Sequence, residues 1–158
     1  MTQLEQHRHP GLAAAHLGSP EVTADSVEAV NQLLALVGHA RDNGADELLT
    51  EIFTPEVVLD DGGAVSTGLD AVAEAFGSQR NEVSHHTVNT VVRQAPRSRD
   101  ELVAWSRVIT ITGDGRVASA DVLDEIVGGP GSWRIARRIV RPRHGGADPQ
   151  TELESWWA

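Results

Sequence analysis

Ser84-His85-His86-Thr87-Val88-Asn89-Thr90-Val91-Val92 is the stretch that decides the fold, because polar and β-branched residues alternate along it. Such alternation predicts a β-strand, and neighbouring side chains of a strand point to opposite faces. We therefore expect His85, Thr87 and Asn89 to share one face of a sheet. If that face lines a cavity, His85 is a candidate general base, because histidine exchanges a proton near neutral pH. The two histidines could equally be ordinary polar residues of a strand.

The residues before this strand favour helices, whereas those after it favour further strands joined by turns. Apolar residues recur at helical spacing from Asp25 to Arg41, and Asp42-Asn43-Gly44 ends that helix because glycine suits a left-handed C-cap. Shorter helices are expected at 46–52 and 68–77, and short strands at 57–59 and 64–67. Long strands are expected at 84–94, 101–112, 116–127 and 132–141. This order predicts an α+β fold in which three helices cover one face of a curved, mostly antiparallel sheet that can enclose a pocket.

Composition and charge narrow the class of protein. The chain has 158 residues, 40% of them hydrophobic and 23% charged, which is typical of one soluble globular domain. It contains no cysteine, so disulfides, thiolate nucleophiles and cysteine-ligated zinc are excluded, and we expect a cytoplasmic protein. A net charge of −10 argues against a nucleic-acid partner. We also expect no membrane segment, because no apolar run is long enough to cross a bilayer.

The chain divides into an arm, one domain and a tail. Residues 1–22 are expected to form a loose arm, in which His7 and His9 lack the carboxylate partners that would indicate a metal site. Residues 23–143 form the predicted domain. The tail 144–158 carries Trp156 and Trp157, and two adjacent tryptophans are costly to leave in water. We expect them to dock on the domain, on a neighbouring subunit or over the mouth of the pocket.

Asp42 lies at the C-terminus of the first predicted helix, where the helix dipole disfavours a carboxylate by ~0.3–1 kcal/mol. This placement indicates that Asp42 has another partner, caps the next short helix or is simply solvated. A carboxylate that binds one imidazole nitrogen fixes the tautomer of the ring and raises the basicity of the other nitrogen. An Asp42–His85 pair would therefore be a general base, although sequence spacing leaves open whether the two side chains meet.

Over residues 23–143 several short motifs, in their order and spacing, resemble the SnoaL-like branch of the nuclear-transport-factor-2-like superfamily. They are Arg-Asp-Asn-Gly-Ala-Asp at 41–46, Ile-Phe-Thr-Pro-Glu-Val at 52–57, Gly-Leu-Asp-Ala-Val at 68–72, His-His-Thr-Val-Asn at 85–89 and Ser-Trp-Arg-Ile-Ala-Arg-Arg at 132–138. Within the superfamily the pattern is most similar to the group of scytalone dehydratase and hexachlorocyclohexane dehydrochlorinase. The resemblance implies a cone-shaped α+β barrel and an enzyme that uses an Asp–His dyad and no metal or cofactor.

The resemblance assigns roles to particular positions. In that group the dyad Asp lies eleven residues before an aromatic residue, as Asp42 lies before Phe53, and the dyad His lies four residues before an Asn, as His85 lies before Asn89. The dehydrochlorinase has a pocket arginine five residues after a tryptophan of the last strand, which corresponds here to Arg138. The implied catalytic residues are Asp42, His85 and Arg138. Substrate contacts are expected from Asn89, Trp105, Arg107, Asp121, Trp133, Phe53 and Asp61.

The sequence departs from the dehydratase where Arg41 stands directly before Asp42, because the dehydratase has a tyrosine there and this chain contains none. Arginine, asparagine or water would have to polarise a carbonyl instead. Because Arg137 and Arg138 are neighbours on a strand, only one of them can enter the pocket. Our leading hypothesis is a lyase or isomerase, free of metal and cofactor, in which His85 removes a proton from carbon of a small, largely apolar molecule.

Two other classes of function stay open. A polyketide cyclase or an enzyme resembling epoxide hydrolase would use pocket carboxylates, either Asp61 in its Asp-Asp-Gly-Gly turn, or Asp121 and Asp124 on the third long strand, with Asp121 beside Arg107. Such carboxylates are also typical of turns and of surface ion pairs. A non-catalytic module would bind a small ligand in the same pocket. In every case we expect a small hydrophobic partner and a homodimer or homotrimer.

Overall fold

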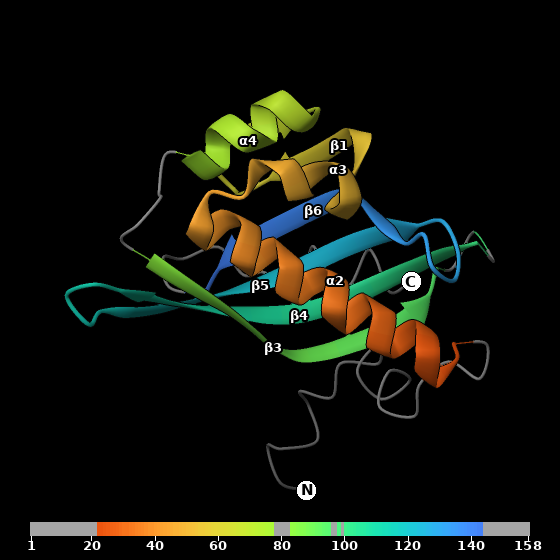
Figure 1. Ribbon diagram of the computed structural model, residues 1–158. Coiled ribbons are helices and arrows are strands. Elements are labelled where there is room, and N and C mark those ends of the chain that lie inside the picture. The colour runs from red at the N-terminus through yellow and green to blue at the C-terminus, as the bar shows by residue number, and fades with distance from the viewer. Residues whose placement is uncertain (1–21, 78–82, 96–97, 99, 144–158) are drawn as a thin grey trace, which may run out of the picture.

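The computed structural model describes residues 22–77, 83–95, 98 and 100–143, which form helices packed on one curved sheet (Figure 1). The helical elements are α2 (Ala24–Asn43), the 3-10 helix η2 (Asp46–Leu48), α3 (Leu49–Ile52) and α4 (Leu69–Gly77). The strands are β1 (Phe53–Asp60), β2 (Val65–Thr67), β3 (Val83–Gln94), β4 (Glu101–Thr112), β5 (Val117–Val127) and β6 (Arg134–Pro142). The expectations for the histidines of the arm and for the paired tryptophans of the tail lie outside the described residues.

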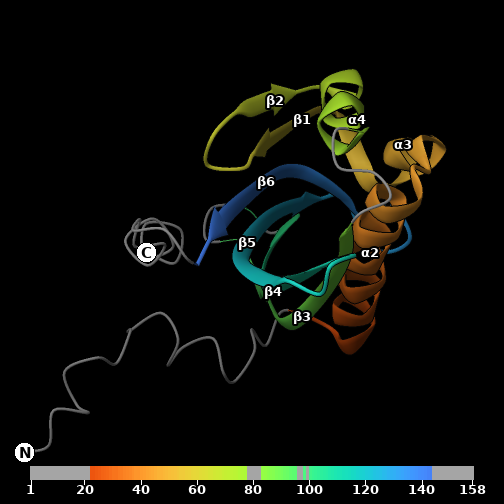
Figure 2. The ribbon, with the colours of Figure 1, turned by 90° about the vertical axis from the view of Figure 1, so that its left-hand side faces the viewer.

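The six strands form one sheet in the order β2-β1-β6-β5-β4-β3. Every neighbouring pair is antiparallel except β1 and β6, which run parallel. The sheet curls strongly, and α2 lies beside its hollow side (Figure 2). The predicted α+β fold with a curved, mostly antiparallel sheet is confirmed. The sheet is not closed into a full barrel, because β2 and β3 are its two edges.

Helix α2 has a cap at each end that its sequence supplies. The Thr23 hydroxyl accepts the backbone N–H of Ser26 at 3.1 Å, which is the usual role of threonine at an N-cap. Gly44 ends the helix in a left-handed conformation with φ 63°, and its N–H donates to the carbonyl of Ala40. One side of the helix is buried from its middle toward its C-terminal end, through Val30, Leu33, Leu34, Val37, Gly38 and Ala40.

The main core lies between the helices and the hollow face of the sheet. Phe53 and Phe76 meet there edge to face, with ring centroids 6.1 Å apart. Burial of each large apolar side chain contributes about 1.5–3 kcal/mol before the loss of conformational entropy is counted. This packing holds α2 and α4 on the sheet. The aliphatic side chains that are completely buried in this core are Val30, Leu34, Ile52, Val57, Val72, Ala104, Ile126 and Ile135.

A β-bulge interrupts the pairing of β3 with β4. Between the pairs Val88–Arg107 and Val91–Trp105, β3 has one residue more than β4. Asn89 lies in this bulge with φ 54°, a left-handed conformation that asparagine adopts more readily than most residues. The strict alternation expected from the sequence therefore ends at the bulge.

The bulge decides which side chains of β3 face inward. His85 and Thr87, before the bulge, face the hollow side of the sheet and line a cavity. Val92, after the bulge, is buried in the main core. Asn89 is exposed and does not line the cavity, so the expectation that it shares a working face with His85 is corrected.

The element boundaries differ little from those expected from the sequence. The short strand expected at 57–59 extends over 53–60, and the short helix expected at 46–52 is divided into a 3-10 helix and one α-helical turn. Within the described part of the chain, no helix is both long enough and apolar enough to cross a membrane. The homodimer or homotrimer and the cytoplasmic location stay predictions.

Candidate active site

The carboxylate of Asp42 binds His85 through both of its oxygens. Oδ1 lies 2.5 Å from His85 Nδ1, and Oδ2 accepts the backbone N–H of His85 at 2.9 Å. The two residues proposed as a dyad therefore meet, which explains why a carboxylate stands in the last turn of α2. Because a carboxylate accepts hydrogen bonds, Nδ1 carries the proton and Nε2 holds the lone pair of the neutral ring.

A glycine allows α2 to approach β3 closely enough for this contact. A Cβ added to Gly38 would lie 3.0 Å from the carbonyl oxygen of His85, which is so tight that the strand would have to shift by a few tenths of an ångström. Four residues further along the helix, Asp42 stands on the same side as Gly38, because a helix turns once every 3.6 residues. The position of the dyad thus depends on a helix that can lie almost directly against the strand.

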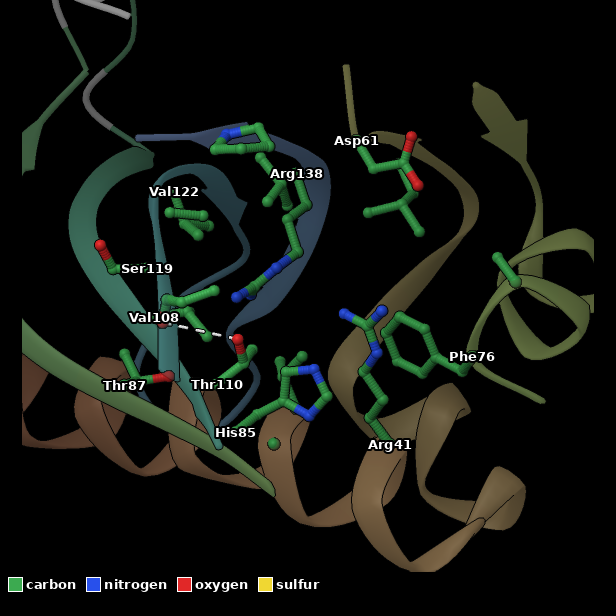
Figure 3. Close-up of a pocket in the computed structure, with 18 of the residues that line it drawn as sticks. Arg41, Asp61, Phe76, His85, Thr87, Val108, Thr110, Ser119, Val122 and Arg138 are labelled. Carbon is green, nitrogen blue, oxygen red and sulfur yellow. Dashed lines mark hydrogen bonds between the residues drawn. The ribbon is translucent and has the colours of Figure 1, made fainter. Parts of the chain in front are cut away.

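His85 opens onto a cavity of about 500 Å³ between the hollow face of the sheet and helices α2 and α4 (Figure 3). Its side chain is 7% exposed. Asp42 does not line the cavity, so Nε2 is the ring nitrogen that faces the cavity. The apolar lining consists of Val37, Leu59, Ala64, Ala75, Phe76, Val108, Ala118, Ala120, Val122, Val140 and Pro142. The polar lining consists of Arg41, Asp61, Ser66, His85, Thr87, Thr110, Ser119 and Arg138.

Arg138 brings a buried cation to the cavity wall. It projects from β6, and its Nη1 donates to both carboxylate oxygens of Asp124 on β5, at 3.2 Å each. Burial raises the pKa of Asp124 to about 6, against the charge of Arg138, which lowers it. Arg137, the neighbour of Arg138 on the strand, does not line the cavity and lies opposite Glu125 in the sheet. Only one of the two arginines enters, as the alternation of a strand requires.

Arg41 is a second cation of the cavity wall. Its guanidinium carbon lies over the ring of Phe76, 5.2 Å from the ring centroid. Burial lowers the pKa of Arg41 and the charge of Arg138 lowers it further, whereas two nearby carboxylates raise it. Figure 3 shows the guanidinium groups of Arg41 and Arg138 reaching from opposite walls toward the space next to the His85 ring.

This arrangement places a neutral base beside positive charge in the wall of a partly open cavity. Burial lowers the pKa of His85 by more than the hydrogen bond to Asp42 raises it, and the charges of Arg41 and Arg138 lower it further. The neutral ring, which can accept a proton, is therefore favoured near neutral pH. Such a site suits removal of a proton from a molecule on which negative charge develops. Among the described residues, no group of three or more His, Cys, Asp or Glu side chains is placed to hold a metal ion.

A comparison with protein families identifies the domain. The profile of the SnoaL-like domain matches residues 22–139, which span all the described helices and strands except the end of β6. The chain belongs to the SnoaL-like domain family. A comparison with proteins of curated function found no match.

Solved structures share the fold of this SnoaL-like domain at low sequence identity. A protein with a cystatin-like fold from Nostoc punctiforme is 18% identical with a TM-score of 0.69, over 78% of this chain and 96% of that one. A candidate scytalone dehydratase from Novosphingobium aromaticivorans is 22% identical with a TM-score of 0.60, over 73% and 83%. LinA is 18% identical with a TM-score of 0.60, over 78% and 92%. These similarities show a common fold.

Three further residues expected at the substrate lie near the cavity of the SnoaL-like domain, but only one lines it. Asp61 lines it, and its Oδ1 also accepts two backbone N–H groups of the turn after β1, at 3.2 and 3.0 Å. Phe53 is buried in the core, where it packs against Phe76, and Phe76 lines the cavity instead. Trp133 packs against the same core outside the cavity lining.

The remaining expected contacts lie on the opposite, outer face of the sheet. Arg107 and Asp121, expected side by side, form an ion pair with Nη2 3.2 Å from Oδ1, and Arg143 Nη1 lies 2.6 Å from Asp121 Oδ2. Trp105 packs on the same face, against its own small apolar cluster. Val108, Ala120 and Val122, the sequence neighbours of Arg107 and Asp121, line the cavity, so alternation turns Arg107 and Asp121 away from it. Trp105 lies two residues before Arg107 on β4 and therefore shares its face. The expectation that Trp105, Arg107 and Asp121 contact substrate there is corrected.

Sequence reasoning missed four residues that shape the site. Arg41 was considered only as the residue that replaces a tyrosine, although its helical spacing from Gly38 places both on one side of α2. Asp124 was considered as a possible acid and not as the partner of Arg138. For Gly38 and Phe76, the sequence predicted only that they lie in helices. The pairing of Asp124 with Arg138 depends on the register of β5 with β6, for which the sequence offers no local signal.

Proposed function

We propose that this SnoaL-like domain is a lyase or isomerase that removes a proton from carbon of a small, largely apolar molecule. One observation carries the proposal: the His85 ring, bound at Nδ1 by Asp42, presents Nε2 to a cavity that two arginines also line. The apolar part of the wall suits an apolar substrate body, and a volume of about 500 Å³ is suited to a small molecule.

The proposed step is an elimination or a shift of a double bond. His85 Nε2 takes the proton, and the electrons of the broken C–H bond form a new C=C bond. In an elimination, a leaving group on the next carbon departs with its bonding electrons; in an isomerisation, the proton returns to another carbon. Asp42 stabilises the imidazolium that forms, and Arg138 and Arg41 stabilise the negative charge on the substrate or leaving group.

A carbon acid that reports on base catalysis tests this step without knowledge of the natural substrate. A nitrobenzisoxazole opens to a coloured phenolate when a base removes its carbon-bound proton. We expect the protein to accelerate this opening, and His85→Ala to lower the rate by about 10²–10⁴-fold, because that is the usual contribution of a positioned general base. Asp42→Asn should lower the rate as well, because the charge that stabilises the imidazolium is lost.

His86→Ala is the matched control, because His86 is the next residue of β3 and is exposed on the other face. It should leave the rate unchanged. Equal rates for the wild-type protein and His85→Ala, with both proteins folded by circular dichroism, would contradict the assignment of the base.

A second candidate function uses a carboxylate of the cavity in a cyclisation or hydrolysis. Asp61 supports it, because among the described residues it is the only acidic side chain that lines the cavity. However, Asp61 also accepts hydrogen bonds from the turn after β1, which indicates a structural role. Asp61→Asn separates the two functions: the His85 mechanism tolerates this change, and a carboxylate mechanism does not. A non-catalytic ligand-binding module would bind small molecules and leave the probe untouched.

A further inference from the structure

The outer face of the sheet carries a stripe of apolar side chains. Trp105 of β4, Leu123 of β5 and Ile139 of β6 lie side by side, because Trp105 pairs with Leu123 and Leu123 pairs with Ile139. Together with Val103 they form the outer stripe, a cluster to which no described helix contributes a residue. A sheet face that meets water normally presents polar side chains, so the outer stripe indicates that this face makes a contact.

Arginines beside the outer stripe carry more positive charge than the carboxylate between them balances. Arg107 and Arg143 both bind Asp121, with N–O distances of 3.2 and 2.6 Å. The side chain of Asp121 is 4% exposed, whereas those of Arg107 and Arg143 are 34% and 39% exposed. Two guanidinium groups thus share one carboxylate, and this group stays positive in a chain whose net charge is −10. Such a surface favours an acidic partner.

The described part of the chain ends on this same face. Arg143, its last residue, donates its backbone N–H to the carbonyl of Ser119 at 3.0 Å. Ser119 precedes Leu123 by four residues on β5, so the outer stripe begins about 13 Å away along the strand. Trp156 stands 13 residues after Arg143, and an extended chain of that length spans up to about 43 Å. The C-terminal segment is therefore long enough to reach the outer stripe.

The sequence of the C-terminal segment 144–158 matches this face in charge and in polarity. It contains no lysine or arginine, and Glu152 and Glu154 shortly precede Trp156 and Trp157. Carboxylates suit the guanidinium groups beside the outer stripe, and hydrogen bonds between such charged groups are stronger than those between neutral ones. Two indole rings are costly to leave in water and suit an apolar surface. Acidic and aromatic residues thus follow each other in the segment as arginines and apolar residues do on the sheet.

We propose that the C-terminal segment 144–158 docks on the outer stripe of its own chain. Its two tryptophans contact the apolar side chains, and its two glutamates lie near Arg107 and Arg143. The sequence alone left three places for the tryptophans: the domain, a neighbouring subunit and the mouth of the cavity. Charge and chain length favour the first of these places. The inference concerns the face opposite the cavity and is independent of the proposed function.

A spin label at the end of the chain tests this docking. Because the chain contains no cysteine, Ala158→Cys provides a single site for a nitroxide. The nitroxide weakens the NMR signals of nearby backbone amides in the isotope-labelled full chain. We expect a larger loss of signal for Leu123 and Ile139 than for Val37 of α2 and Ala75 of α4, which line the cavity. Equal losses, or larger losses at Val37 or Ala75, would overturn the inference.

A mixed sample separates docking within one chain from docking between two copies. It combines isotope-labelled chains that carry no nitroxide with nitroxide-labelled chains of natural isotope content. We expect no loss of signal at Leu123 or Ile139 in this mixture. If these signals are weakened there as strongly as in the doubly labelled chain, the segment reaches a second copy and the inference fails.

Replacement of the tryptophans tests the apolar part of the contact. In the nitroxide-labelled chain, Trp156→Ala together with Trp157→Ala should abolish most of the loss of signal at Leu123. The dispersion of the amide signals shows whether this variant is folded. A folded variant with an undiminished loss of signal at Leu123 would mean that the indole rings do not contact the outer stripe, and the inference would fail.

Replacement of the glutamates tests the charged part. Glu152→Gln together with Glu154→Gln should reduce the loss of signal at Leu123, most clearly at low salt, where charges are least screened. Glu47→Gln together with Glu51→Gln is the matched control, because it changes the net charge equally at exposed positions of η2 and α3. The control should keep the full loss of signal. Equal behaviour of the two double variants would contradict the match of charges between the segment and the outer face.

Discussion

Arg138 and Arg141 lie three residues apart on β6, and each binds an aspartate, but they lie on opposite faces of the sheet. On the inner face, Arg138 meets Asp124 with the two side chains 6% and 0% exposed. On the outer face, Arg141 binds Asp60 of β1 with Nη1 and Nη2 at 2.9 Å each, and the two side chains are 18% and 20% exposed. A spacing of three in a strand, with its two-residue period, produces this separation.

The two faces move the pKa of the aspartate in opposite directions. On the outer face, the hydrogen bond from Arg141 lowers the pKa of Asp60. On the inner face, burial raises the pKa of Asp124 to about 6, although the charge of Arg138 lowers it. On the inner face, the loss of hydration therefore raises the pKa of the aspartate more than the charge of its arginine lowers it. On the outer face, the hydrogen bond from the arginine has the larger effect.

The difference indicates what each pair contributes. A buried ion pair is a weak source of stability, because desolvation offsets much of the attraction between its charges. The inner pair instead holds a cation in the cavity wall, where the proposed chemistry needs it. The outer pair fastens the end of β1 to β6 and supports the turn that carries Asp61.

The largest effect is expected from breaking the inner pair. Asp124→Ala leaves the Arg138 charge buried without its carboxylate, and we expect the free energy of unfolding to fall by about 3–5 kcal/mol. Asp60→Ala, the matched change on the outer face, should cost about 1 kcal/mol or less, because its arginine can turn toward water. Urea unfolding at neutral pH, followed by circular dichroism, measures both.

A double variant sharpens this test. Asp124→Leu with Arg138→Met replaces both charges by apolar groups and should recover most of the stability lost in Asp124→Ala, while removing the cation from the cavity. Similar losses for Asp124→Ala and Asp60→Ala would mean that the inner pair is solvated as well as the outer one, and the contrast between the faces would fail.

The fold could be predicted because its signals are local. The cap of α2 at Gly44, the alternation before Asn89 and the glycine turns between the long strands each act within a few residues. Part of the site could also be predicted from local features of the sequence. Asp42 stands out because a carboxylate at a helix C-terminus lacks a local justification, and His85 stands out on an alternating strand.

The other residues of the site could not be predicted locally. Their positions depend on which face of the sheet is hollow and on the register of the strands, which are long-range properties. Arg107 and Asp121 were expected together and do lie together, but on the outer face. A bulge of one residue turns Asn89 away from the face on which it was expected. Asp124 became visible as the partner of Arg138 only once β5 was paired with β6.

The next effect in size is a pH dependence of stability that separates the two faces. The pKa of Asp124 is about 6 in the folded protein against an ordinary value of 3.8, so between about pH 4 and 6 the folded state binds more protons than the unfolded state. Stability from this group therefore falls as pH rises through that window. Asp60 has a lowered pKa, so its contribution is present above pH 3.8 and is lost only below it.

Asp124→Asn replaces the titratable carboxyl on the inner face by an amide of the same shape. We expect the gap in unfolding free energy between wild type and Asp124→Asn to change by on the order of 1–3 kcal/mol between pH 4 and 6, in favour of the wild type at the lower pH. The gap between wild type and Asp60→Asn should stay constant over the same range. Urea unfolding at several pH values provides both gaps, and a constant gap for Asp124→Asn would contradict the raised pKa.

The smallest expected effect concerns the helix that covers only the inner face. In Gly38→Ala the new Cβ would lie 3.0 Å from the carbonyl oxygen of His85, so helix and strand must move apart. Overpacking costs about 1–3 kcal/mol, and the better helix propensity of alanine offsets about 1 kcal/mol, which leaves a net loss of about 1 kcal/mol. Gly129→Ala is the control, because nothing lies within 4 Å of its added Cβ.

Activity distinguishes this displacement from a general loss of stability. The contact between Asp42 and His85 spans 2.5 Å, so a shift of a few tenths of an ångström between α2 and β3 weakens the support of the base. Gly38→Ala should therefore slow the opening of the nitrobenzisoxazole at a temperature where the variant is fully folded, and Gly129→Ala should not. A Gly38→Ala protein that is more stable than wild type and equally active would show that the inner face does not depend on this close approach.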